Sequence, residues 1–245
     1  MAHTTRVLAT LLGALTGFEN IVGIELLNEP HPGEHTQKLK DWYTSTIAQL
    51  RSLDAGVPLY VSDCWQTDDY AEYISALSPY DAITSVDHHL YRCFTAYDVH
   101  TSIGQHTKDL SDPNAQTPQT FERVAKRLEP YSSAIVVGEW SGAVNPGSLQ
   151  GLSSEQELAA RRAYIDAQLA LYEKHCAGHF FWTYKKEQRG DKGWSLRDAV
   201  EGGVFADFVG RRAKSNCSGD GRRRQSSMEQ SKQKALGRCI LFSTK

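Results

Sequence analysis

The sequence predicts an α/β fold built on a parallel sheet. Three observations indicate it. Short apolar segments of strand length recur along the chain, segments with helical periodicity alternate with them, and the strand segments are almost wholly apolar instead of alternating between apolar and polar residues. A strand that is apolar on both faces is typical of a parallel sheet covered by helices on both sides.

Composition and charge restrict the kind of protein. The chain has 245 residues, of which 40% are hydrophobic and 23% charged, and its net charge is −2. These values indicate a globular protein and give no reason to expect nucleic acid or an anionic membrane as a partner. The charge is uneven, because residues 211–245 hold ten Lys and Arg against two Asp and Glu, a net charge of +8. We expect a folded body over residues 1–210 and a basic, disordered tail over 211–245.

The first element expected is an amphipathic helix at the N-terminus. Its apolar residues fall on one helical face, and Thr4 and Thr5 are available as caps. No secretory signal peptide is expected, since the apolar stretch is short and lacks a cleavage site. No apolar run reaches the roughly 18 residues that a membrane span needs. The residues of the apolar face are Val7, Leu8, Leu11, Leu12 and Leu15.

Strands and helices then alternate. The expected strands are residues 21–27, 57–63, 82–89, 133–140 and 178–185. The expected helices are residues 36–52, 69–77, 118–128 and 154–175, with a long polar loop before the third of them, and residues 196–209 are expected to contain a closing helix. In residues 36–52 the buried face is expected to consist of Leu39, Trp42, Tyr43, Ile47 and Leu50. Ser154 and Glu157 have the spacing of a capping box at the start of the fourth helix.

Polar and aromatic residues gather where these strands end. They are Asn28 and Glu29, Asp63, Asp87 to His89, and Glu139 with Trp140. In a (β/α)8 barrel the active site lies at the carboxyl ends of the strands. No glycine-rich nucleotide-binding motif opens any of the helices, so a doubly wound sheet gains no support. The prediction is a (β/α)8 (TIM) barrel that is incomplete, because five strands are too few to close it.

Glu29 and Glu139 are the residues that indicate chemistry. Each one follows an apolar strand, and each is followed by a residue that limits its freedom. Two carboxyl groups that face each other across a cleft can cleave a glycosidic bond, one as proton donor and the other as nucleophile or as base for a water molecule. Asn28 could bind a sugar hydroxyl, and Trp182 could pack against the apolar face of a sugar ring.

Other interpretations are weaker. Either glutamate alone could be a solvated loop residue or an ion-pair partner. His88 and His89 are adjacent on a strand and point to opposite faces, so at most one faces the cleft, and we expect no metal site. The loop H-P-G-E-H lacks the H-E-x-x-H order of a zinc protease. The five cysteines contain no C-x-x-C pair, which disfavours a zinc site or a disulfide scaffold.

Four motifs taken together resemble a known family. The segments G-I-E-L-L-N-E-P, V-D-H-H-L-Y, V-V-G-E-W and F-F-W-T-Y-K resemble the retaining glycoside hydrolases of family 5, specifically the fungal exo-β-1,3-glucanases, over residues 4–209. The resemblance implies that Glu29 is the acid/base and Glu139 the nucleophile. It also implies substrate contacts from His89, Tyr91, Trp182 and, at an outer subsite, Phe94.

The chain differs from that family at its start. The family's Asn-Glu-Pro closes the fourth barrel strand, whereas here it follows the first expected strand. Three strands, together with the Arg and His that brace the nucleophile, are therefore expected to be missing. An incomplete or mis-spliced gene product would explain this. The basic tail also departs from the family's ending.

The resemblance implies an exo-acting glucan 1,3-β-glucosidase that releases glucose from β-1,3-glucan with retention. It implies no cofactor, a β-glucan as substrate, no nucleic acid or membrane partner, and a monomer. Two alternatives stay open: an inactive carbohydrate-binding fragment of such an enzyme, and an unrelated α/β interaction protein. Localisation is open as well, because the family is mostly secreted while this sequence shows no signal peptide and its unpaired cysteines fit a reducing compartment.

Overall fold

The described strands form one parallel sheet. The computed structural model describes residues 1–18, 20–77, 83–205 and 240–242. The sheet has six strands in the order in which they occur along the chain, and each pairs in parallel with the next. The strands are β1 (Ile24–Glu25), β2 (Leu59–Ser62), β3 (Thr84–Arg92), β4 (Ile135–Val144), β5 (Gly178–Phe181) and β6 (Ile240–Phe242).

This topology is that of an incomplete (β/α)8 barrel. Consecutive strands are neighbours, which is the order of a barrel and not of a doubly wound sheet. Among the described residues β1 and β6 each have one strand neighbour, so the sheet does not close. The predicted fold class is confirmed, with one more strand than the sequence suggested. That strand, β6, lies in the basic tail, most of which falls outside the described residues.

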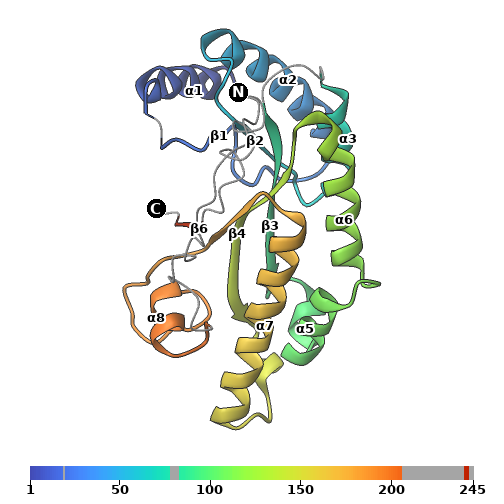
Figure 1. Cartoon of the computed structure of the whole chain (residues 1–245), viewed down its shortest axis with the longest axis vertical. Helices are drawn as coiled ribbons and strands as arrows, with labels where there is room; N and C mark the ends of the chain where they lie inside the picture. The colour runs from blue at the N-terminus through green and yellow to red at the C-terminus, as the bar shows by residue number, and fades with distance from the viewer. Residues whose placement is uncertain (19, 78–82, 206–239, 243–245) are drawn as a thin grey trace, which may run out of the picture.

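The helices follow the strands in alternation. They are α1 (Ala2–Leu15), α2 (Thr36–Leu53), α3 (Thr67–Ala76), α4 (Ala96–His100), α5 (Ile103–Ser111), α6 (Gln116–Leu128), α7 (Ser154–His175) and α8 (Leu196–Glu201), with short 3-10 turns at Glu129–Tyr131 and Pro146–Leu149. Figure 1 shows α3, α6, α5 and α7 as a layer beside β3 and β4. That layer covers the outer face of the sheet.

The expected face of α2 is the buried one. Its members, Leu39, Trp42, Tyr43, Ile47 and Leu50, all belong to the hydrophobic core. Each buried aliphatic side chain of this kind contributes about 1.5–3 kcal/mol through the hydrophobic effect. Trp140, which follows Glu139 on β4, is also buried and packs edge-on against Phe181 and Tyr172.

Two sequence predictions about helices were wrong. The long polar loop after β3 contains α4 and α5, because Thr95 and Ser102 each cap a short helix with their side chains. The capping box of α7 lies one residue earlier than predicted, between Ser153 and Gln156. The closing helix expected within residues 196–209 is present as α8, which ends at Glu201, and Gly203 follows with a φ of +71°. A residue with that backbone angle stops a helix.

The prediction for α1 was partly wrong. The helix begins after Met1, so Thr4 and Thr5 lie inside it and do not cap it. Leu8 and Leu12 are buried, whereas Val7 and Leu11 are exposed, so the buried stripe is narrower than the apolar face. Within the described ranges no helix has the length and apolar character needed to cross a membrane.

The sheet register determines how the strand ends face one another. β3 and β4 shift register between His88 and His89, so His88 pairs with Val137 while His89 pairs with Glu139. Irregularities of this kind redirect side chains and are common beside active sites. At β1, Gly23 lies so close to Tyr60 that a Cβ there would be 2.2 Å from the ring. Only glycine permits the chain to enter the sheet at this point.

Candidate active site

Three predicted residues meet at the carboxyl ends of the strands. His89 Nδ1 lies 2.7 Å from Glu29 Oε1 and 3.7 Å from Glu139 Oε2. One carboxylate oxygen of Glu29 and one of Glu139 lie within 4.8 Å of each other. These residues come from the loop after β1, from β3 and from β4, so the parallel sheet brings together side chains that are far apart in the sequence.

The backbone at Glu29 is unusual. Its φ is +44°, in the left-handed region that a residue with a Cβ seldom adopts, and Pro30 follows at once. Such a conformation costs of order 1–3 kcal/mol and persists only where surrounding contacts hold it. Here the contact is the short hydrogen bond from His89, which holds the Glu29 side chain toward β3 while 35% of it stays exposed.

Tyr91 orients the second carboxylate. Its hydroxyl donates a hydrogen bond of 2.7 Å to Glu139 Oε2. Burial, and then the hydrogen bond and charge of Glu139, raise the pKa of Tyr91, so the phenol stays a donor at every pH of interest. Only 15% of the Glu139 side chain is exposed. The two glutamates therefore lie close together in different surroundings.

His89 lies between these acids and is itself buried. Burial lowers the pKa of His89, but the hydrogen bond and charge of Asp87, the hydrogen bond of Glu29 and the charge of Glu139 outweigh it and raise that pKa to about 9. At neutral pH both ring nitrogens then carry protons. Nδ1–H faces Glu29, and Nε2–H faces Asp87 Oδ2 at 3.5 Å.

His88 faces the other side of the sheet. Its Nδ1 lies 2.7 Å from Asp63 Oδ2, and its ring packs edge-on against Phe121 of α6. The expectation that the two adjacent histidines point to opposite faces of the sheet is confirmed. Burial raises the pKa of Asp63, but the charge and hydrogen bond of His88 outweigh it, and the pKa of Asp63 is lowered overall. This pair stabilises the fold behind the site.

Two groups of three potential metal donors occur among the described residues, and both include His89. One contains Glu29 and Glu139, and the other contains Glu25 and Asp87. A protonated imidazole has no lone pair to offer a metal ion. A metal ion in either group would therefore have to displace a proton from His89, whose pKa is raised.

Aromatic side chains border the carboxylates. Phe94 is strongly exposed, and its ring centroid lies 5.4 Å from that of Tyr91. The ring of Trp194 lies 5.4 Å from Tyr91 and 6.0 Å from Phe94, so the three rings form one cluster. Sequence reasoning missed Trp194, because it lies in the loop after β5 with no motif around it. Aromatic faces of this kind suit the apolar sides of sugar rings.

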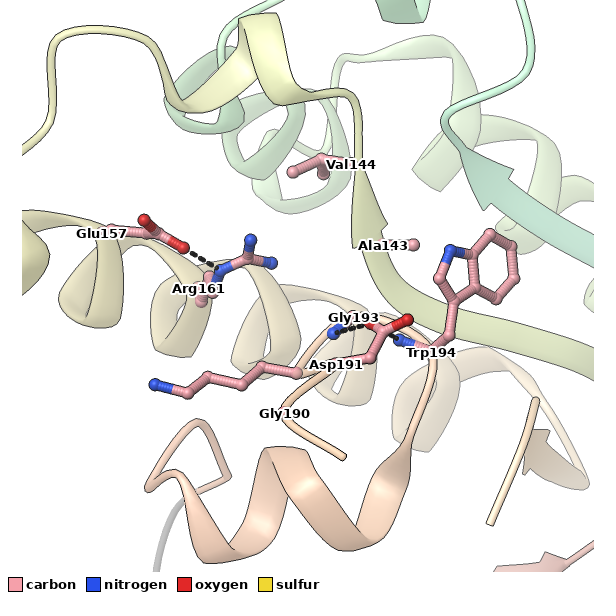
Figure 2. Close-up of a pocket in the computed structure, with 9 residues that line it drawn as sticks. Ala143, Val144, Glu157, Arg161, Gly190, Asp191, Gly193 and Trp194 are labelled. Carbon is pink, nitrogen blue, oxygen red and sulfur yellow. Dashed lines mark hydrogen bonds and ion pairs between the residues drawn. The ribbon is translucent and has the colours of Figure 1, made fainter. Parts of the chain in front are cut away.

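A tight turn holds Trp194 in place. Asp191 Oδ1 accepts hydrogen bonds of 3.0 Å from the backbone N–H groups of Gly193 and Trp194. Lys186 Nζ lies 3.0 Å from the other oxygen of Asp191. Figure 2 shows Asp191 bonded to this turn, with the Trp194 indole extending from it beside β4. The same turn borders a cavity of about 300 Å³ that also touches Arg161.

The two remaining predicted residues lie nearby. Trp182 follows β5 directly and is half-buried, and its backbone N–H donates to the carbonyl of Trp140 at 2.7 Å. The peptide bond after it is cis. Asn28 precedes Glu29 and is exposed. Sequence reasoning also missed Glu25 on β1, although a single carboxylate within an apolar strand is a visible signal.

A comparison with protein families identifies the chain. The model of the cellulase family, glycosyl hydrolase family 5, matches residues 6–188. The chain belongs to glycosyl hydrolase family 5. The approach of two carboxyl groups at the ends of parallel strands is consistent with membership of this family.

Two of the similar proteins are fungal glucan 1,3-beta-glucosidases by name. Over 203 residues the chain is 29% identical to glucan 1,3-beta-glucosidase 3 of Schizosaccharomyces pombe, covering 83% of this chain and 40% of the relative. It is 28% identical over 219 residues to "Probable glucan 1,3-beta-glucosidase A" of Aspergillus fumigatus, covering 76% of this chain and 48% of the relative. The chain thus spans about half, or less, of the length of these relatives.

A solved structure supports the fold. The chain is similar to a hyperthermophilic endo-beta-1,4-glucanase crystallised with its substrate, with a TM-score of 0.51 and 12% sequence identity. The match covers 79% of this chain and 59% of that one. At this identity the likeness concerns the course of the backbone and not the substrate.

Proposed function

We propose that this family 5 chain is a retaining glycoside hydrolase that releases glucose from β-1,3-glucan by exo action. The observation that carries the proposal is the approach of Glu29 and Glu139, whose nearest carboxylate oxygens lie within 4.8 Å. Retaining enzymes have carboxyl groups about 5–5.5 Å apart, whereas inverting enzymes need roughly 6.5–9.5 Å to admit a water molecule. The observed approach favours retention.

In this proposal Glu139 is the nucleophile. It attacks the anomeric carbon and forms a covalent glycosyl-enzyme, while the bond to the leaving oxygen breaks. The Tyr91 hydroxyl donates to Glu139 Oε2 and so fixes one oxygen, which leaves the other free to approach the sugar. Since Tyr91 keeps its proton, it does not compete with the carboxylate as a base.

Glu29 is the acid/base. It gives a proton to the leaving oxygen in the first step and removes one from water in the second. Its greater exposure and its position outside the regular strand suit contact with the leaving group and with water. The hydrogen bond from His89 holds the Glu29 carboxyl group beside Glu139, where both steps require it.

The substrate class rests on the aromatic cluster and the named relatives. Tyr91, Phe94 and Trp194 form an apolar border beside the carboxylates, and Trp182 lies at the end of the next strand. Such surfaces bind sugar rings by their apolar faces. Two relatives carry the name glucan 1,3-beta-glucosidase, which supports a β-1,3-glucan as the substrate of this chain.

The test is hydrolysis of laminari-oligosaccharides by the purified chain, followed by proton NMR of the first sugar released. We expect β-glucose to appear first and α-glucose to follow only by mutarotation. Release of α-glucose first would contradict retention. Binding of the oligosaccharide without any release would favour the alternative of a carbohydrate-binding fragment and would contradict the proposed activity.

A further inference from the structure

Two acids lie directly beneath the catalytic pair. Glu25 is on β1 and Asp87 is on β3, and one donor atom each of Glu25, Asp87 and His89 lies within 4.8 Å of the others. Side chains from alternate strands form the layers inside a (β/α)8 barrel, and those layers are dominated by Val, Ile and Leu. Two acids in such a layer need a physical explanation.

The burial of these acids is a second feature that needs an explanation. Asp87 is buried, and among the described residues neither Glu25 Oε1 nor Asp87 Oδ1 has a hydrogen-bond partner. Room for the Asp87 carboxylate comes from Gly138 on β4, where a Cβ would lie 2.2 Å from Asp87 Oδ1. Ionised carboxylates are acceptors only, so two of them side by side cannot satisfy each other. One proton makes one of them a donor and gives both a partner.

The surrounding charges lead to the same conclusion. If every acid were ionised, Glu25, Asp87, Glu29 and Glu139 would all face the single imidazolium of His89. Carboxylates that share a buried site do not all ionise. Asp87 is the member that faces His89 Nε2, so it is the natural anion of the pair, and Glu25 is the natural holder of the proton.

We propose that Glu25 and Asp87 share one proton and hold His89 as an imidazolium whose Nδ1–H is directed at Glu29. They are thus positioning residues for the catalytic pair, a role that rests on the proposed function. Glu25 donates to Asp87, the Asp87 carboxylate faces His89 Nε2–H, and His89 donates to Glu29.

The ionisation of Glu25 agrees with this chain of contacts. Burial first, and then the charge and hydrogen bond of Asp87, raise the pKa of Glu25 to about 8. The other groups that act on the pair are His89 on β3, Glu139 on β4, Tyr60 on β2 and Tyr43 on α2. His89 is the only cation in this set, and the tyrosines stay neutral because burial raises the pKa of both.

Infrared difference spectroscopy of the full chain tests the shared proton without any activity. Between about pH 7 and about pH 9.5, surface carboxyls stay ionised while Glu25 loses its proton. We expect the C=O stretch of a protonated carboxyl at the lower pH, lost with a midpoint near the Glu25 pKa of about 8. The band should be missing in Glu25→Gln, an isosteric mimic of the neutral acid, and unchanged in the exposed control Glu34→Gln.

A second variant keeps the test informative if Glu25→Gln does not fold. Asp87→Asn removes a group that raises the pKa of Glu25, so the band should remain and its midpoint should fall below the wild-type value. Absence of a protonated-carboxyl band from the folded wild type would overturn the proposal, as would its persistence in Glu25→Gln. Stoichiometric binding of a divalent cation such as Zn²⁺ at neutral pH, lost in Glu25→Gln, would overturn it too, by placing a metal where we place the proton.

The positioning role needs an activity readout. With dinitrophenyl β-glucoside as substrate, the leaving group needs no protonation by Glu29. The decrease of kcat/KM at high pH therefore reports the pKa values of groups other than Glu29. Glu25→Gln should keep kcat/KM at neutral pH within about twofold of the wild type, and the decrease of kcat/KM at high pH should move to a higher pH. Asp87→Asn should lower kcat/KM about 10- to 100-fold, which is the usual effect of removing the partner of a functional histidine. If kcat/KM decreases at the same pH in the wild type and in Glu25→Gln, the positioning role is contradicted. If no chain hydrolyses the glucoside, the proposed function fails, while the infrared result still decides the shared proton.

Discussion

At the scale of single residues, environment separates the two catalytic candidates. Glu139 is mostly buried and accepts a hydrogen bond from Tyr91, whereas Glu29 is more exposed, has a left-handed backbone and is held by His89. Chemically identical carboxyls take different roles when their surroundings differ in this way. The difference makes the roles testable by substitution.

Removing the acid/base should affect substrates unequally. Glu29→Ala takes away the proton donor but leaves Glu139 able to attack. Aryl glucosides with acidic phenols should still form the glycosyl-enzyme, which then accumulates because the base for the second step is missing. Added azide should restore turnover of the aryl glucoside by acting as the second nucleophile, and it should restore none on laminari-oligosaccharides. Steady-state kinetics with and without azide measure this, and equal loss on both substrates without rescue would assign another role to Glu29.

Sequence reasoning reaches most of this site but not all of it. The position of polar residues near the ends of apolar strands indicates Glu29, His89 and Glu139, whereas Tyr91 comes only from the family resemblance. The structure brings the four side chains together. Trp194 was missed because its position depends on the turn at Asp191, which no periodicity reveals. Glu25 was missed because it lies inside a strand. Its contact with Asp87 depends on how β1, β2 and β3 pair, and not on the residues around Glu25 in the sequence.

At the scale of elements, the loop after β5 completes the aromatic border. Its backbone returns to the strand end through hydrogen bonds between Thr183 and both Trp194 and Leu196. Asp191 then closes the turn that presents the indole. Burial raises the pKa of Asp191, but the backbone hydrogen bond from Trp194, with Lys186 and Gly193, outweighs it, and that pKa is lowered overall. The turn therefore depends on an ionised carboxylate.

Loosening this turn should weaken substrate binding. Asp191→Ala removes the acceptor of two backbone N–H groups, each bond to a charged group contributing about 1.5–3 kcal/mol. Because Trp194 contacts sugar and not the reacting atoms in this account, KM for laminari-oligosaccharides should rise about tenfold while kcat changes little. Asp109→Ala is a matched control, since its partners Tyr97 and Gln105 lie in α4 and α5. A fall in kcat at constant KM in Asp191→Ala would contradict the assignment.

Elements differ in how well the sequence predicts them. The face of α2 was predicted residue by residue, because a helix that covers a sheet has a period its apolar residues must follow. The cap of α7 was misplaced by one residue, and α4 and α5 were missed, because short helices depend on side-chain capping more than on periodicity. The register shift at His89 has no sequence signal, since it arises from pairing with β4.

At the scale of the whole molecule, the titration of His89 and Glu25 makes the stability of the fold depend on pH. The pKa of His89 rises from 6.5 to about 9, so its contribution to stability is complete below pH 6.5 and is lost as pH rises through 9. The pKa of Glu25 rises from 4.5 to about 8, so the folded state keeps a proton that the unfolded state has already released. In both cases the folded state binds more protons, and stability falls as pH increases.

Thermal melts should therefore show a falling Tm between pH 6.5 and 9 that levels off above this range. For a chain of this size, each kcal/mol lost lowers Tm by about 2–4 °C. Glu25→Gln cannot ionise, so its Tm should fall less over the same range. A Tm that stays flat or rises from pH 6.5 to 9 would show that these groups do not titrate as described.

The sheet as a whole shows what composition and pattern can predict. Apolar strands alternating with helices predicted a parallel sheet, and polar strand ends predicted the barrel class; both are confirmed. The sixth strand was not predicted, because Ile240–Phe242 is a short segment in basic surroundings and becomes a strand by pairing with β5. Closure of the sheet depends on strands beyond those described, which no local pattern can supply.

The central claim is that Glu139 attacks the sugar while Glu29 assists, and trapping the covalent intermediate tests it most directly. The chain is incubated with dinitrophenyl 2-deoxy-2-fluoro-β-glucoside, whose fluorine slows the second step, and is then analysed by intact-mass and peptide mass spectrometry. We expect one fluoroglucosyl group per chain on the peptide that contains Glu139, and none in Glu139→Gln. A folded wild-type chain that acquires no label, or carries it on another residue, would contradict the account.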